Sequence, residues 1–281
     1  MTVLTGSLNQ VWPRLLERTL RTGQALAPRG QPILELRQET IAVDMTQPLL
    51  TIKDRKVSMK GAAAEAAWIC SGSDKLSEIQ PYLPKMQLFS DDGATLFGAY
   101  GPRFREQLGY VVAKLLEDED TRQAAMTLWR PNPPATKDVP CTTMLDFKLR
   151  QRKLNLHVFM RSSDQWLGVP YDVFSFTMMA CCVLGLVNQG GISAPGRPLF
   201  PYYSLGTLYL TAASSHIYDR DRDAAISITE LGHSLAPVVT LPDLLWNGTL
   251  SPDGIVGALQ TYRDGTQPFY RYQEDFSDCV S

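Results

Sequence analysis

Apolar residues recur at helical spacing in some segments of the chain and alternate with polar residues in others. The spacing of Leu8, Val11 and Leu15 predicts an N-terminal helix over residues 8–26. We expect further helices over residues 61–70, 110–116 and 173–185. Alternation and β-branched content predict strands over residues 33–43, 124–129, 143–149, 154–160 and 205–214. The short charged turn at residues 150–153 predicts that the strands on either side form a hairpin.

These elements favour one α+β domain over residues 1–281. The chain is long enough to bury a large core, and no linker, repeat or low-complexity block divides it. Helices and strands are interspersed, which predicts helices packed on a large sheet.

Composition narrows the classes of function. A hydrophobic content of 44% and a charged content of 20% are ordinary for a globular protein. The net charge of -2 argues against nucleic acid as a partner. We expect no signal peptide, because residues 1–24 lack a long apolar stretch. We expect no membrane span, because Ser175 and Thr177 interrupt the longest apolar run. Five cysteines without pairing spacing and three scattered histidines predict a reducing, cytoplasmic setting and no metal site.

Candidate chemistry concentrates in residues 161–172, Arg-Ser-Ser-Asp-Gln-Trp-Leu-Gly-Val-Pro-Tyr-Asp. This segment holds a cation, hydroxyls and two carboxylates, and Cys141 precedes it in Val-Pro-Cys-Thr-Thr. A cysteine after a proline is, by itself, more often a buried strand-end residue than a nucleophile. Glu65, in contrast, lies within an apolar helix, where burial would raise its pKa and suit it to general acid–base work.

The two motifs together resemble the thymidylate synthase family, in which a Pro-Cys nucleophile is followed by RS-x-D-x-x-LG-x-P-x-N. The resemblance implies that the thiolate of Cys141 adds to C6 of a pyrimidine nucleotide and so activates C5. It implies a phosphate grip by Arg161 and Ser162, and the guanidinium should also lower the pKa of the thiol. The family's His after the cysteine is here Thr142.

Further positions follow the same resemblance. His216 and Tyr218 match an H-x-Y that binds the sugar 3'-hydroxyl, and Gly168 belongs to the substrate-binding motif. The remaining matches are Asp164 for the carboxylate that contacts folate, Tyr100 for a catalytic tyrosine, Glu65 for the glutamate of H-E-L-L-W, Arg29 for the arginine of a mobile loop, and Arg122 for an arginine that the partner subunit lends to the phosphate.

Asp172 stands where the family has Asn, at the edge of the base. Uracil presents N3–H and O4, which an Asn carboxamide complements, whereas cytosine presents an acceptor N3 and a donor N4. An Asp suits cytosine if its carboxyl is protonated or if N3 takes the proton, and an unpaired group would cost about 1–3 kcal/mol. The competing interpretation is that Asp172 only caps a helix beginning at residue 173. Asp at this position marks the cytidylate-specific, phage-type branch of the family.

The resemblance implies 5,10-methylenetetrahydrofolate as cofactor and leaves the last step open. The synthases' W-D-x-W segment is replaced by residues 86–89, Met-Gln-Leu-Phe, and the chain end at residues 276–281 is more polar than theirs. Both differences predict a wetter site and favour addition of water over hydride transfer.

We therefore expect a thymidylate synthase-like fold and a homodimer packed sheet to sheet. The expected activity is that of a dCMP 5-hydroxymethylase. We expect the protein in the cytoplasm, which is the host's cytoplasm if a phage encodes it. The alternatives are a dCMP C5-methyltransferase, a CMP hydroxymethylase and an inactive relative that binds nucleotide or RNA.

Overall fold

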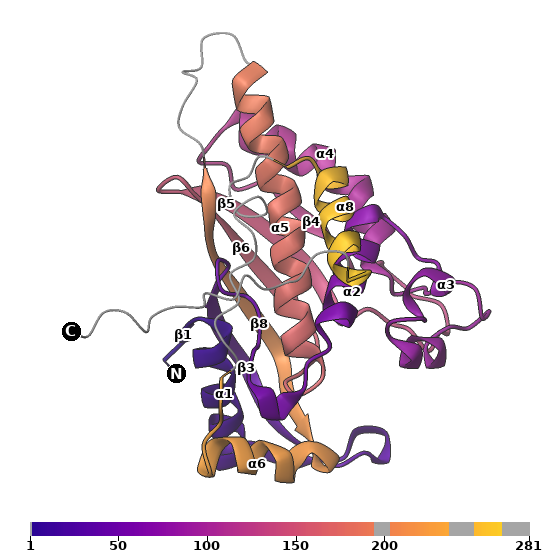
Figure 1. The fold of residues 1–281 in the computed structure, drawn as a ribbon, viewed down its shortest axis with the longest axis vertical. Coiled ribbons are helices and arrows are strands. Elements are labelled where there is room, and N and C mark those ends of the chain that lie inside the picture. The colour runs from indigo at the N-terminus through magenta and orange to yellow at the C-terminus, as the bar shows by residue number, and fades with distance from the viewer. Residues whose placement is uncertain (1, 194–202, 236–249, 266–281) are drawn as a thin grey trace.

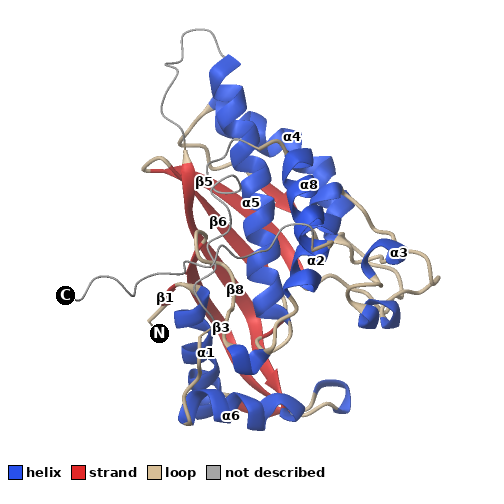
Figure 2. Cartoon of the chain, in the orientation of Figure 1, coloured by secondary structure: helices blue, strands red, loops and turns tan. Residues whose placement is uncertain are grey.

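The computed structural model describes residues 2–193, 203–235 and 250–265. A single mixed sheet of eight strands runs through it in the order β1-β3-β8-β6-β5-β4, with β2 beside β3 and β7 beside β8 (Figures 1 and 2). The strands are β1 (Leu4–Gly6), β2 (Gln24–Leu26), β3 (Ile33–Asp44), β4 (Ala125–Thr127), β5 (Thr142–Arg150), β6 (Lys153–Met160), β7 (Ser163–Asp164) and β8 (Ser204–Tyr218).

The described helices lie on one face of this sheet (Figure 1). The α-helices are α1 (Leu8–Thr22), α2 (Met59–Ser71), α3 (Leu76–Ile79), α4 (Tyr100–Glu117), α5 (Gly168–Ser193), α6 (Arg222–Glu230) and α8 (Pro252–Arg263). Short 3-10 turns are η1 (Pro28–Gly30), η2 (Lys53–Arg55), η3 (Pro84–Leu88) and η4 (Asp219–Asp221). The expected α+β class and thymidylate synthase-like architecture are confirmed.

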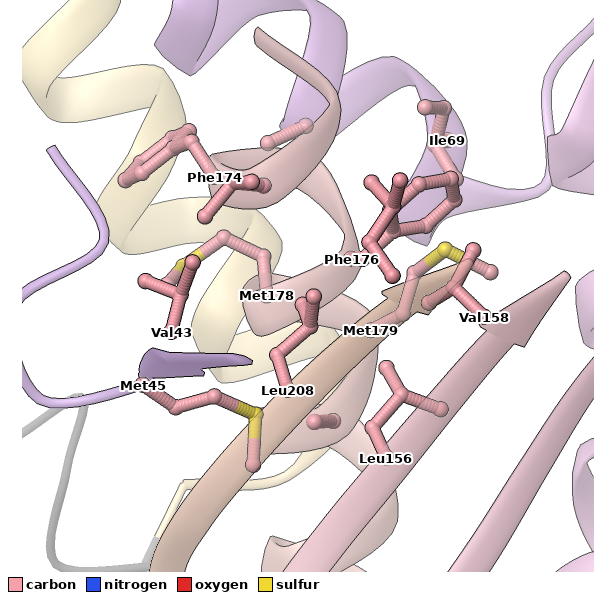
Figure 3. Close-up of a cluster of buried hydrophobic side chains, with 14 of the residues drawn as sticks. Val43, Met45, Ile69, Leu156, Val158, Phe174, Phe176, Met178, Met179 and Leu208 are labelled. Carbon is pink, nitrogen blue, oxygen red and sulfur yellow. The ribbon is translucent and has the colours of Figure 1, made fainter. Parts of the chain in front are cut away.

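Helix α5 is the centre of the core. Its apolar side chains pack against alternate residues of β6 and β8, such as Leu156, Val158 and Leu208, all fully buried (Figure 3). Each large aliphatic or aromatic side chain buried in this way contributes roughly 1.5–3 kcal/mol. Because β6 continues directly into the segment that precedes α5, this packing holds both ends of that segment in place.

The opposite face of the sheet carries no helix among the described residues. On β6 the buried positions Leu154, Leu156 and Val158 alternate with the more exposed His157 and Phe159. His157 stacks on Tyr209 of β8, with ring centroids 4.7 Å apart. This open face is therefore partly aromatic and only partly exposed to solvent.

The expected β5–β6 hairpin is confirmed. Gln151 and Arg152 connect the two strands and both have positive φ (52° and 60°), as in the tight turns that match strand twist. The expected strand 33–43 and helix 61–70 also match β3 and α2 to within two residues.

Several boundaries were wrong. The first helix ends at Thr22, not residue 26, and residues 24–26 form β2 against β3. Helix α4 begins at Tyr100, ten residues before the expected start, and α5 begins at Gly168 instead of residue 173. Strand β8 continues through His216 to Tyr218, because β3 and β7 pair with it there. The polar chain end and Cys279 lie outside the described residues.

By length and composition, the stretch Gly168–Gly190 of α5 meets the criteria for a membrane span, contrary to the expectation from its interrupting polar residues. However, 83% of the qualifying window is buried inside the protein. Ser175 and Thr177 are themselves buried there, and Thr177 satisfies its hydroxyl by donating to the Val173 carbonyl at 2.8 Å. This is the environment of a central core helix.

Candidate active site

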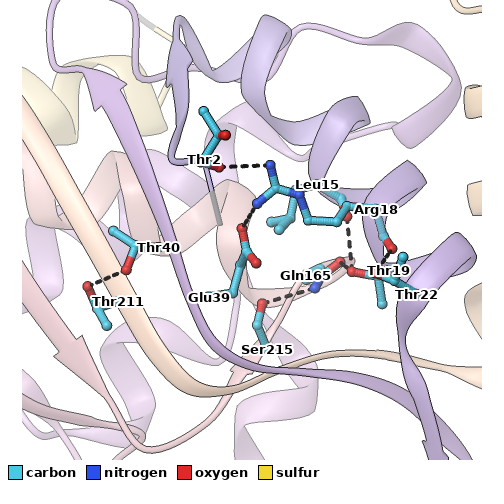
Figure 4. Close-up of polar contacts among 10 residues, drawn as sticks. All are labelled: Thr2, Leu15, Arg18, Thr19, Thr22, Glu39, Thr40, Gln165, Thr211 and Ser215. Carbon is cyan, nitrogen blue, oxygen red and sulfur yellow. Dashed lines mark hydrogen bonds and ion pairs between the residues drawn. The ribbon is translucent and has the colours of Figure 1, made fainter.

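Gln165 fixes the segment that carries the candidate site. Its backbone N–H donates to the His216 carbonyl at 2.8 Å, and its amide donates to Ser215 Oγ at 2.9 Å. Thr19 of α1 donates to Gln165 Oε1 at 2.9 Å (Figure 4), while Trp12 donates to the Gln165 carbonyl at 2.6 Å. Gln165 is completely buried, so one residue ties α1 and β8 to the chain between β7 and α5.

Asp164 is held by its own neighbours. Its Oδ1 accepts from the backbone N–H of Trp166 at 2.8 Å and of Leu167 at 3.0 Å, and its strand partner on β8 is His216. The carboxylate is thereby fixed where the chain turns into α5.

Asp172 lies within α5, one turn beyond its start, so the interpretation that it caps a helix starting at residue 173 is wrong. Gly168 stands beside it: a Cβ on Gly168 would be 3.1 Å from Asp172 Oδ2. Burial, together with the negative charges of Glu65 and Asp164, raises the pKa of Asp172 well above its usual range. The carboxyl groups of Asp172, Glu65 and Asp164, three residues of the predicted site, therefore lie near one another.

Glu65 of α2 is surrounded by buried alanines, and burial raises its pKa to about 7. The Ser175 hydroxyl is close enough to lower that pKa slightly, yet Ser175 Oγ makes no hydrogen bond of normal geometry in the described structure. A carboxyl group with a pKa near 7 can both take up and release a proton at neutral pH.

Cys141 lies just before β5 and is partly buried. The expectation of a lowered thiol pKa is corrected. Burial raises the pKa of Cys141 and outweighs the opposing effects of Arg161 and Arg29, while Asp172 and Asp138 raise it further. The charge effect predicted for Arg161 is present, but desolvation is larger.

Arg161 is bonded to the loop that carries the nucleophile. Its Nε donates to the Pro140 carbonyl at 3.0 Å and a terminal nitrogen donates to the Val139 carbonyl at 2.8 Å. Its backbone N–H also donates to the Cys141 carbonyl at 2.8 Å. Ser162 follows it directly and is partly exposed.

Tyr100, the first residue of α4, faces the same site. The pKa of its phenol is raised by burial and further by the negative charges of Asp172 and Cys141. Thr142 donates to the phenol oxygen twice, from its hydroxyl at 3.0 Å and from its backbone N–H at 3.3 Å. The ring stacks on Phe176 of α5 with centroids 6.1 Å apart.

His216 and Tyr218 lie at the end of β8, with ring centroids 5.1 Å apart and planes nearly perpendicular. His216 is 6% exposed and its Nδ1 has no hydrogen-bond partner among the described residues. Burial lowers the pKa of His216, and Asp164 partly opposes this. Burial therefore favours the neutral imidazole.

The structure thus brings most of the predicted residues together around Cys141 and Asp172. Arg29, on the exposed turn η1, is near enough to act on the Cys141 thiol. Arg122 is the exception: it is exposed between α4 and β4, beside the far end of β5, and does not join this group within one chain.

Sequence reasoning missed three residues of this region. Arg55 donates to the Trp166 carbonyl at 2.8 Å, and its guanidinium lies 5.2 Å from the Trp166 ring centroid. No local pattern distinguishes Arg55. Ser175 could have been found, because residues three apart on a helix share a face with each other and Asp172 is three residues earlier. Thr142 was noted only as a missing histidine.

Among the described residues, no group of three or more His, Cys, Asp or Glu side chains could hold a metal ion. A surface cavity of about 650 Å³ lies between the start of α1 and residues 47–51, lined by polar residues such as Asn9, Arg14 and His233. It contains none of the predicted site residues.

Comparison with known proteins gives the class to which this site belongs. The thymidylate synthase family model matches residues 10–242. The chain is 33% identical over 242 residues to a deoxyuridylate hydroxymethyltransferase of Bacillus phage SP01, which covers 78% of this chain and 59% of the relative. It is 33% identical over 147 residues to the protein of the same name from Delftia phage PhiW-14, covering 46% and 41% of the two chains. A putative thymidylate synthase of Methanosarcina acetivorans is 31% identical over 153 residues, 51% of this chain and 64% of the relative.

The chain belongs to the thymidylate synthase family. It spans about half the length of the curated phage relatives it matches. Enzymes of this family transfer a one-carbon unit from methylenetetrahydrofolate to a pyrimidine nucleotide.

Proposed function

We propose that the protein hydroxymethylates C5 of a pyrimidine nucleotide, with dCMP as the preferred substrate. The observation that carries the choice of base is Asp172, a carboxyl group of raised pKa beside Cys141, Tyr100 and Glu65. The phage relatives named as hydroxymethyltransferases support the choice of reaction.

The preference for cytosine depends on a proton shared between the Asp172 carboxyl group and N3 of the base. Cytosine N3 accepts protons far more readily than a uracil oxygen does, so Asp172 and cytosine can hold one proton between them and form two charge-assisted hydrogen bonds. An ionised Asp172 facing uracil would accept from N3–H but would place a carboxylate oxygen against O4. That juxtaposition leaves acceptors unpaired and disfavours uracil.

dUMP is the second candidate substrate, because the pKa of Asp172 is raised. Burial raises the pKa of Asp172 and so favours its neutral carboxyl, and a neutral carboxyl can accept from N3–H of uracil while donating to O4. The names of the phage relatives also specify deoxyuridylate. The two candidate substrates therefore require different states of Asp172. dCMP needs a proton shared between Asp172 and cytosine N3, whereas dUMP needs a neutral Asp172 carboxyl.

In this proposal Cys141 forms the bond to C6, and its thiolate leaves again when the product forms. Because burial raises the thiol pKa, the thiolate must be favoured by nearby cations, of which Arg161 and Arg29 are in range. The substrate phosphate would then bind Arg161 together with Ser162, and His216 and Tyr218 would bind the sugar.

Glu65 would take the proton from the water that completes hydroxymethylation, for which a pKa of about 7 is suited. Access for water is supported by residues 86–89, which replace the synthases' W-D-x-W. There, Leu88 and Phe89 are 67% and 45% exposed.

The described residues fit a folate cofactor. Asp164 offers a fixed carboxylate for ring N–H donors, and Leu167 beside it is 40% exposed, which provides an apolar surface. Methylenetetrahydrofolate, when bound, supplies the one-carbon unit; Asp164 and Leu167 would orient it.

We also propose that residues 1–281 form one domain that pairs as a homodimer through the open sheet face. The partly exposed aromatic pair His157–Tyr209 and the 39% exposed Phe159 on that face support it. Arg122, which lies away from its own chain's site, would then be available to the partner's phosphate. Sedimentation equilibrium tests the dimer, and mixing an Arg122→Ala chain with a Cys141→Ser chain should restore activity if the arginine acts across the interface.

The decisive experiment incubates the protein with methylenetetrahydrofolate and an equimolar mixture of dCMP and dUMP, and measures product masses. Hydroxymethylated cytidylate without dihydrofolate is the expected result. Hydroxymethylated uridylate would favour the second candidate, and a methyl product with dihydrofolate would refute hydroxymethylation. Cys141→Ser is the control and should yield no product while still binding nucleotide.

A further inference from the structure

The contact between Thr142 and Tyr100 is not explained by substrate binding. Thr142 is completely buried, and it follows the candidate nucleophile directly in the chain. Both of its donors, the hydroxyl and the backbone N–H, are directed at the same oxygen, that of the Tyr100 phenol.

A phenol oxygen has two lone pairs and one proton. With Thr142 donating to the oxygen twice, further hydrogen bonding by the phenol is left to its proton. The ring cannot easily turn away, because it stacks on Phe176 and is anchored at the first residue of α4. The phenol O–H therefore points away from Thr142. We infer that it faces Asp172 and Cys141, whose negative charges act on the phenol.

We propose that Thr142 is a positioning residue: it fixes the Tyr100 phenol as a hydrogen-bond donor aimed between Cys141 and Asp172. This rests on the proposed function, since the acceptor of that proton would be the substrate or the water that reacts with it. In hydroxymethylation, a water that accepts from Tyr100 keeps a lone pair for the new C–O bond and gives its own proton to a base, for which Glu65 is placed. The chain then replaces the family's histidine with a residue that acts only through Tyr100.

The test is a double-mutant cycle. Thr142→Val keeps the shape and the backbone N–H but removes the hydroxyl, and should lower kcat by about tenfold while KM stays within about twofold. Thr142→Ser retains the donor and should restore kcat. In a Tyr100→Phe background the same Thr142→Val change should have almost no further effect, because contacting residues that act as a unit are not additive.

A matched control is Thr177→Val on α5, another completely buried threonine whose hydroxyl bonds only its own helix. It should leave kcat within about twofold of the wild type. An equal loss from Thr142→Val in the wild-type and Tyr100→Phe backgrounds would show a general structural role and overturn the inference. Failure of Thr142→Ser to restore kcat would do the same.

A second measurement needs no turnover. The Cζ resonance of Tyr100 in protein labelled with 13C-tyrosine, assigned by its loss in Tyr100→Phe, should shift in Thr142→Val and return in Thr142→Ser. If the wild type converts neither dCMP nor dUMP, the proposed function fails, and the resonance alone decides the inference. An unchanged Tyr100 resonance in Thr142→Val overturns it whatever the activity.

Discussion

Glu39 and Glu65 are both carboxyl groups enclosed by the protein, but they have different surroundings. Glu39 of β3 is 3% exposed and forms an ion pair with Arg18 of α1 (Figure 4). Burial raises the pKa of Glu39, and Arg18 opposes that rise. Among the described residues no cation acts on Glu65; burial raises its pKa to about 7, and only the Ser175 hydroxyl opposes that rise.

The comparison shows how one chain uses buried charge in two ways. At Glu39 the guanidinium offsets part of the desolvation cost and joins α1 to the sheet, which is a structural role. At Glu65 the cost is left in place, so the pKa rises to about 7 and the carboxyl group can gain or lose a proton at neutral pH. The negative charge of Glu65 in turn helps to raise the pKa of a second carboxyl group, Asp172.

The largest expected difference between Glu65 and Glu39 is in their effect on turnover. Glu65→Gln should lower kcat by about 10²–10⁴-fold, since general acid–base catalysis typically contributes that much. Glu39→Gln, which keeps a hydrogen-bond acceptor for Arg18, is the control and should change kcat little. Both are measured as the rate of nucleotide product formation under saturating substrate. Similar losses in the two variants would mean that Glu65 has no special role.

The second difference is in the pH dependence of stability. Glu65 has a pKa of about 7 in the fold against an ordinary 4.5, so the folded state binds its proton more tightly than the unfolded state does. Its contribution is complete below pH 4.5 and is lost as the pH rises through 7, by up to about 3 kcal/mol.

Urea unfolding at pH 5 and pH 8 measures this effect. The fall in unfolding free energy between the two values should be smaller in Glu65→Gln than in the wild type. An identical fall in both proteins would contradict the assigned pKa.

Removing Arg18 should make Glu39 resemble Glu65. Arg18→Met leaves a buried carboxylate without its cation and should cost about 3 kcal/mol of unfolding free energy at pH 8, and less as the pH falls and Glu39 takes up a proton. The control is Arg21→Met, whose partner Glu17 lies in an exposed pair worth less than about 0.5 kcal/mol. Equal costs for the two variants would refute the buried pair.

The smallest expected effect concerns the base. Asp172→Asn should shift the ratio of dCMP to dUMP kcat/KM by about tenfold toward dUMP, because the carboxamide pairs with uracil without needing a shared proton. Asp138→Asn alters another carboxyl group that raises the pKa of Cys141, and it should leave this ratio unchanged. A ratio unaffected by Asp172→Asn would remove the case for cytosine.

Sequence patterns predicted more of the fold than of the site's electrostatics. The periods of β5 and β6 are clear because one face of each is buried, and α2 was recognised from its alanine content. The starts of α4 and α5 were placed too late. Pro102 and Pro170 lie in their first turns, where proline is tolerated because the N–H groups there have no helical partner.

The sequence by itself determined the contiguous chemistry: the motif from Arg161 to Asp172, the cysteine before it, and the apolar helix around Glu65. Only the tertiary structure decided which charges meet. Arg18 pairs with Glu39, whereas no cation of the described residues acts on Glu65, and Thr142 bonds Tyr100 across 42 residues. It also decided that burial outweighs Arg161 at the Cys141 thiol. The physical reason is that desolvation and charge pairing depend on distances in space, which residues far apart in sequence acquire only when the chain folds.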